Sequence, residues 1–128
     1  NYTVEQGANI IATGTVHATG PTTNFAINVG VSFTGAATIK WDGSSFLRKH
    51  TAINLTGNGQ SIGTATLTNG DADFSGEVDA VDIDDVIANF GQIWPGGTGN
   101  IHTDVDVSGE VDAIDIDIVI GNFGSLDD

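Results

Sequence analysis

Apolar and polar residues alternate strictly along residues 25–33, FAINVGVSF, so that five apolar side chains share one face. A period of two sustained over nine residues predicts a half-buried strand. Shorter runs separated by turn signals such as Asp42-Gly43 and Asn69-Gly70 predict further strands within 9–20, 37–41, 46–55 and 61–68. About five short strands joined by turns predict a small antiparallel β-sandwich over residues 1–68.

The hydrophobic period changes from two to 3.6 in the second half of the chain. Apolar residues there follow an i, i+3, i+4, i+7 stripe twice, at Ile83, Val86, Ile87 and Phe90 and again at Ile116, Val119, Ile120 and Phe123. Each stripe stops at a glycine, Gly91 or Gly124, which is a common helix end. Two amphipathic helices are therefore predicted, packed together through these stripes.

A duplicated segment surrounds the two stripes. Residues 71–91 and 104–124 are identical at 16 of 21 positions and lie 33 residues apart. A solvated acidic face or a disordered acidic tail would not reproduce the same glycine and the same acids twice. The repeat therefore predicts two copies of one functional unit.

The acids of each copy have the spacing of the EF-hand calcium loop. Side-chain oxygens fall at loop positions 1, 3, 5, 9 and 12, with glycine at position 6 making the sharp turn that lets the backbone carbonyl at position 7 face the cation. The candidate ligands are Asp71, Asp73, Ser75, Glu77 (backbone), Asp79 and Asp82 in the first loop, and Asp104, Asp106, Ser108, Glu110 (backbone), Asp112 and Asp115 in the second. Val78 and Val111, at position 8, are expected to pair as a short strand between the loops.

Composition favours cations over other partners. The chain has 17 acidic residues against three Lys and Arg, so nucleic acid and anionic membrane would be repelled. Cysteine is absent, which excludes disulfides and thiolate metal sites, and no apolar run approaches the roughly 20 residues of a membrane span. The chain starts at Asn1 and lacks methionine, which fits a secreted protein after signal-peptide removal or a cloned fragment, and we favour the secreted, cell-surface interpretation.

The charge is concentrated in one half of the chain. Residues 71–128 contain 15 acids and no Lys or Arg, which predicts a domain boundary at about Gly70 and domains of residues 1–68 and 69–128. Because these acids repel one another until cations bind, we expect two Ca²⁺ ions to be needed for the folding of residues 69–128.

Two loop-helix repeats without a helix before either loop resemble the dockerin domain, over residues 69–128. The resemblance implies two calcium ions, antiparallel helices and a cohesin partner. Loop positions 10 and 11 are Ala80-Val81 and Ala113-Ile114, where cellulosomal dockerins usually have polar pairs. The expected fold class is therefore α+β, with two small domains, a β-sandwich followed by a helical dockerin-like pair of half EF-hands.

Several functions fit these features, and catalysis is not among them. The chain has no nucleophile elbow, no phosphate loop and no carboxylate pair free of the metal loops, so we expect no enzyme. The main hypothesis is an extracellular structural protein that forms a homo-oligomer or filament, linked by the segment 1–20 or by Val81 and Ile114; this segment could instead pair within its own domain. The alternatives are an anchoring module that binds a cohesin-like partner, and a carbohydrate-binding module that uses Trp41 or Trp94. Threonines on one face of 61–68 and the acceptor patterns at Asn1 and Asn54 also allow attached glycans.

Overall fold

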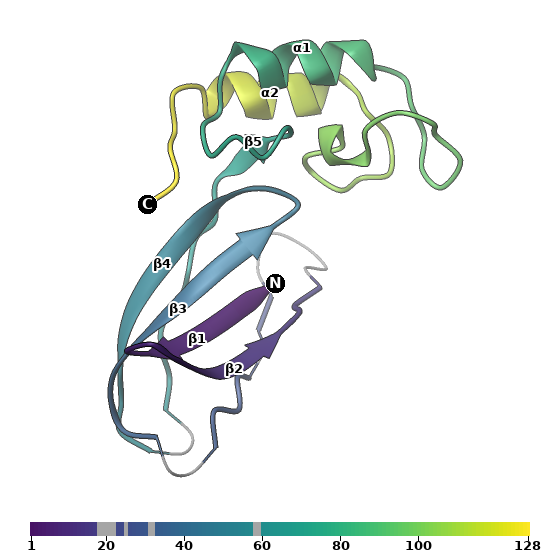
Figure 1. Cartoon of the computed structure of the whole chain (residues 1–128). Helices are drawn as coiled ribbons and strands as arrows, with labels where there is room; N and C mark the ends of the chain where they lie inside the picture. Colours follow the sequence, from purple (N-terminus) through teal and green to yellow (C-terminus); the bar gives the residue numbers. More distant parts are fainter. Residues whose placement is uncertain (18–22, 25, 31–32, 58–59) are drawn as a thin grey trace. The chain divides into compact units, whose positions relative to one another are not determined.

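The structure, a computed structural model, describes residues 1–17, 23–24, 26–30, 33–57 and 60–128. In chain order its elements are the strands β1 (Tyr2–Gln6), β2 (Asn9–Gly14), β3 (Gly35–Gly43), β4 (Ser45–Leu55) and β5 (Asn69–Asp71), followed by the helix α1 (Ala80–Ala88), the 3-10 turn η1 (Ile101–Thr103) and the helix α2 (Ala113–Gly121) (Figure 1). No helix in the described ranges has the length and apolar character that crossing a membrane requires.

The described strands form one antiparallel sheet in the order β2-β1-β3-β4-β5. Strands β2, β3 and β4 confirm the strands predicted within 9–20 and over 37–41 and 46–55. Strand β1 was not predicted, yet it lies inside the sheet, where Tyr2 is paired with Gly14 of β2 on one side and with Trp41 of β3 on the other. The N-terminal segment thus pairs within its own chain, which is the alternative to docking on a neighbouring subunit.

The predicted fold class, a β-sandwich domain followed by a separate helical pair, is wrong. The chain forms a single five-stranded sheet with two short helices, and β5 leads directly into the first acidic loop. The strands predicted over 25–33 and 61–68 are absent from the described parts of those ranges. In the first range the Asn28 side chain accepts a hydrogen bond from Gly30 N (2.9 Å) and Gly30 has a φ of 81°, so a local turn replaces the extended backbone.

The chain divides into two compact units, residues 1–42 with 49–65, and residues 43–48 with 66–128. In the first unit Val4, Ile39 and Trp41 are buried on the sheet, and Trp41 Nε1 donates to Thr51 Oγ1 at 2.9 Å. The second unit is not purely helical, because it includes the start of β4 and all of β5. The turn at Ser44 and the pairing of Ser45 and Phe46 with β5 therefore belong to the second unit.

Helices α1 and α2 lie side by side and run in opposite directions (Figure 1). Their shared core consists of Leu47, Val78, Val86, Val105, Val111 and Val119, with Ile83, Ile116 and Ile118 packed against it. The predicted stripes are only partly right, because Ile87, Phe90, Ile120 and Phe123 are each 55–57% exposed. Each residue advances about 100° around a helix. Ile87 therefore points away from the face that buries Val86, while Phe90 lies beyond the end of α1, where the helical period no longer sets its direction.

Candidate metal centre

Each acidic loop ends in a capping box that starts the following helix. Asp79 is the N-cap of α1, where its carboxylate accepts from Val81 N (2.7 Å), and Asp82 accepts in return from Asp79 N (2.8 Å). Asp112 and Asp115 make the same pair of contacts at the start of α2. Loop positions 9 and 12, predicted as calcium ligands, are therefore also the residues that satisfy the free amides of each helix N-terminus.

The structure brings three predicted ligands of each loop together. Carboxylate oxygens of Asp71, Asp73 and Asp82 lie within 4.8 Å of one another, and those of Asp104, Asp106 and Asp115 do the same. Asp82 and Asp115 are fully buried, while Asp71 and Asp104 are 3% and 6% exposed. At such a separation two charged carboxylates repel by about 3 kcal/mol at an effective dielectric constant of about 20. A divalent cation would remove this repulsion.

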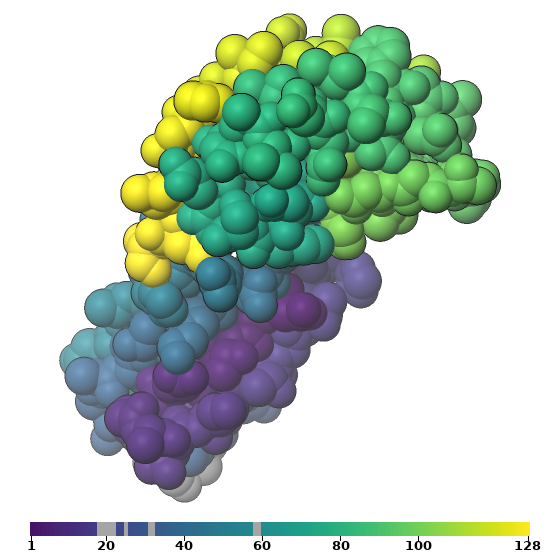
Figure 2. Space-filling view, turned by 45° about the horizontal axis from the view of Figure 1, so that its top comes forward, coloured from purple at the N-terminus to yellow at the C-terminus, as the bar shows by residue number. Residues whose placement is uncertain are grey.

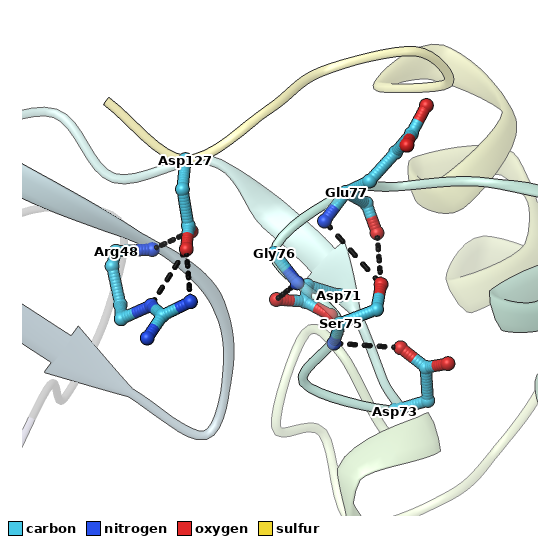
Figure 3. Close-up of polar contacts among 7 residues, drawn as sticks. All are labelled: Arg48, Asp71, Asp73, Ser75, Gly76, Glu77 and Asp127. Atoms are coloured by element: carbon cyan, nitrogen blue, oxygen red, sulfur yellow. Dashed lines mark hydrogen bonds and ion pairs between the residues drawn. The ribbon is translucent and has the colours of Figure 1, made fainter.

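The remaining predicted ligands lie in the loop turns. Ser75 Oγ donates to the carbonyl of Glu77 (3.1 Å), and Ser75 N donates to Asp73 (2.9 Å). The side chain of Glu77 points away from Asp71 and Asp73, as expected for position 7 (Figure 3). Ser108 makes the equivalent contacts with Glu110 and Asp106 in the second loop.

The two loops differ at position 1. Asp104 uses both carboxylate oxygens, which accept from Ser108 N and Gly109 N at 2.9 Å each. Asp71 accepts from Gly76 N at 3.2 Å through Oδ2, whereas its Oδ1 is buried without a hydrogen-bond partner. A buried anionic oxygen without a partner is costly, and a hard cation is the partner that the oxygen-only donor set fits. Burial raises the pKa of both Asp71 and Asp104 in the metal-free protein, with smaller contributions from neighbouring carboxylates.

Each loop is closed by the segment that follows the helix of the other repeat. Val78 N donates to Ser125 O (2.9 Å) and Gly124 N donates to Val78 O (2.7 Å), so the residues after α2 close the first loop. In the second loop, Val111 N donates to Gln92 O (2.9 Å), and Gly91 N donates to Val111 O (2.8 Å). The prediction that Val78 and Val111 pair with each other is wrong, because the backbone N–H and carbonyl of each are hydrogen-bonded to the segment that closes its loop.

The fold is shared with solved proteins. No protein-family model matches the chain, and no curated protein matches it. Two solved structures of a type II Cohesin-X-Dockerin complex from Acetivibrio cellulolyticus contain a chain with a similar fold. The complex with an N-terminal interface mutation matches with a TM-score of 0.65 at 18% identity, covering 98% of this chain and 81% of that chain. The complex with a C-terminal interface mutation matches with a TM-score of 0.63 at 16% identity and the same coverage of both chains. At these identities the likeness concerns the fold.

Eight apolar side chains of this unit are exposed, and we call them together the repeated apolar face. Two of them, Val81 and Ile114, were predicted as contact residues, and the other six were not. Its members occupy equivalent positions in the two repeats, and each is 50–63% exposed. They are Val81, Ile87, Phe90 and Ile93 in the first repeat and Ile114, Ile120, Phe123 and Leu126 in the second. The signal was present in the sequence as repeated apolar residues, but the helical period assigned four of the eight, Ile87, Phe90, Ile120 and Phe123, to the core.

Proposed function

We propose that this chain is a non-catalytic, extracellular module of a cohesin-dockerin-type assembly, and that it binds a cohesin-like partner protein in a calcium-dependent way. The observation that carries the proposal is the pair of carboxylate trios, which recur at a spacing of 33 residues around one small core. The fold shared with a chain of cohesin-X-dockerin complexes supports a role in protein assembly.

Two calcium ions are part of this proposal. Asp71, Asp73 and Asp82 would hold one, and Asp104, Asp106 and Asp115 the other, with Ser75, Ser108 and the backbone carbonyls of Glu77 and Glu110 as further oxygen donors. Bound calcium would supply the positive charge that offsets the clustered carboxylates. The chain itself provides the fixed loop turns, the capped helices and the exchanged closing segments that hold these oxygens together.

The repeated apolar face is the proposed contact surface for the partner. Eight large apolar side chains, placed at equivalent positions of the two helices and the segments after them, are at least half exposed to water. A protein partner that covers them would bury this surface, whereas an oligosaccharide offers little apolar area. Trp41 does not support a carbohydrate platform, because it is only 7% exposed.

A filament of identical subunits is not part of the proposal. One expected link, the N-terminal segment, lies in the sheet of its own chain, where β1 is paired on both sides. The other, Val81 and Ile114, is exposed and belongs to the surface proposed for the partner. Attached glycans also remain only a prediction from sequence.

The test is binding of the full chain to recombinant type II cohesin modules by isothermal titration calorimetry, with calcium and after removal of calcium by a chelator. We expect binding with calcium and none without it. Replacing Ile87 and Ile120 by Ala should weaken binding at least about 10-fold, as for core interface residues. Ile10→Ala is the matched control, because Ile10 is an equally exposed isoleucine (64%) on β2. Calcium binding without any cohesin binding, or cohesin binding that survives chelation, would contradict the proposal.

A further inference from the structure

The segments that close the two loops differ at one equivalent position. In the segment that closes the first loop this position is Asp127, which forms an ion pair, and in the segment that closes the second loop it is Trp94. Asp127 N donates to the carbonyl of Gly76 (2.9 Å), and Trp94 N donates to the carbonyl of Gly109 (2.7 Å), which are equivalent contacts one repeat apart. In the space-filling view the yellow segment that includes Asp127 lies against the teal segment that contains the first loop (Figure 2). The backbone closure is the same in both loops, while the side chains that reinforce it differ.

The Asp127 carboxylate is bound by Arg48, which lies in β4. Its Oδ1 accepts from Arg48 N at 2.6 Å, its Oδ2 accepts from Arg48 Nε at 2.6 Å, and a second guanidinium nitrogen lies 2.6 Å from the same oxygen (Figure 3). Asp128 N also donates to the carbonyl of Arg48 (3.3 Å). The segment that closes the first loop is therefore fixed to β4 by both main-chain and side-chain contacts.

This ion pair lies directly against the turn of the first loop. A Cβ atom placed on Gly76 would be 2.8 Å from Asp127 Oδ2 and 3.3 Å from the guanidinium of Arg48. Gly76 has a φ of 88°, and its N donates to the carboxylate of Asp71, the position-1 ligand with the buried free oxygen. A Cβ atom placed on Gly109 would have the carbonyl oxygen of Trp94 as its nearest neighbour, at 3.5 Å, which is an ordinary van der Waals contact.

We propose that Arg48 and Asp127 are positioning residues for the first cation loop, and that they make its affinity depend on an ion pair that the second loop does not have. The inference rests on the proposed function, since it takes the two loops as cation sites. Holding the carbonyl of Gly76 on one side of its Cα limits rotation of this residue, which keeps its N–H on the other side aimed at Asp71 and keeps the loop closed around the trio. Losing the pair should loosen the first loop and leave the second loop unchanged.

The sign of the effect separates positioning from simple electrostatics. The guanidinium is a positive charge close to a site for a positive ion, so as a point charge it would weaken cation binding. If Arg48 acted only through its charge, Arg48→Met would tighten calcium binding at the first loop. If it acts by positioning, the same change weakens binding there.

The experiment is calcium titration of the full chain by calorimetry, in Asp104→Ala to isolate the first loop and in Asp71→Ala to isolate the second. Arg48→Met should weaken calcium binding at the first loop about 2- to 5-fold, the upper part of the range for an exposed ion pair, and change binding at the second loop by less than about 1.5-fold. Adding Asp127→Asn should cause little further loss, because the pair is already broken. Arg48→Lys should restore part of the affinity.

Lys40→Met is the matched control, because it breaks another surface ion pair, Lys40 with Glu5 (2.9 Å), on strands β3 and β1. Amide hydrogen exchange gives an independent readout, in which Arg48→Met should speed exchange at Gly76 more than at Gly109. Tighter or unchanged binding at the first loop in Arg48→Met, or equal weakening at both loops, overturns this inference alone. A parent chain that binds no calcium overturns the proposed function instead.

Discussion

Two neighbouring residues of α2 should separate folding from partner binding. Val119 is fully buried in the core between the helices, whereas Ile120 is 55% exposed on the repeated apolar face. Val119→Ala removes two carbons, worth about 0.8 kcal/mol each in transfer free energy. With the cavity left behind, the total loss of unfolding free energy should be about 2–3 kcal/mol. In a unit of this size that lowers the melting temperature by roughly 10–20 °C.

Ile120→Ala should behave in the opposite way. Because more than half of this side chain is already in water, the loss of unfolding free energy should stay within about 0.5 kcal/mol. The assay is urea unfolding in calcium, followed by helical circular dichroism, together with calorimetric binding to a cohesin module. Val119→Ala should lower the urea midpoint while the folded fraction still binds the partner, and Ile120→Ala should weaken binding at an unchanged midpoint. Equal destabilisation by the two variants would refute the assignment of core and surface on α2.

Three further outcomes follow from the acidic loops. Chelation should abolish most of the helical circular dichroism signal at low ionic strength, since residues 71–128 contain 15 acids and no Lys or Arg; a helical signal unchanged by excess chelator contradicts this. Burial raises the pKa of Asp71 and Asp104, so the folded metal-free protein binds these protons more tightly than the unfolded chain. This contribution is full below the ordinary value of 3.8 and is lost as pH rises through the raised pKa, so the helical signal in chelator should be larger at pH 4 than at pH 7, whereas with calcium it should not fall as pH rises. Gly76→Ala should destabilise more than Gly109→Ala, because both glycines have positive φ but only Gly76 lies against Asp127; equal thermal shifts would argue against that contact.

The sequence by itself determined the features that depend only on residues close together in the chain. Asp79 and Asp112 start their helices because a side chain next to a helix N-terminus bonds amides two or three residues away, and the 33-residue repeat preserves that pattern. The trios are equally local, since the glycine turn returns the chain so that the first, third and twelfth residues of one short loop meet. Strands β3 and β4 follow from β-rich runs joined at Asp42-Gly43.

Only the tertiary structure decided which loops and strands meet. The alternation over 25–33 predicted a strand, but a strand forms only where a partner edge is available, and the Asn28-Gly30 turn competes locally with extension. The closure of the first loop by residues after α2, and the contact of Arg48 with Asp127 across 79 positions, depend on how the two helices pack. Apolar period alone likewise could not tell buried Val119 from exposed Ile120, because burial is set by the neighbouring helix and not by the residue type.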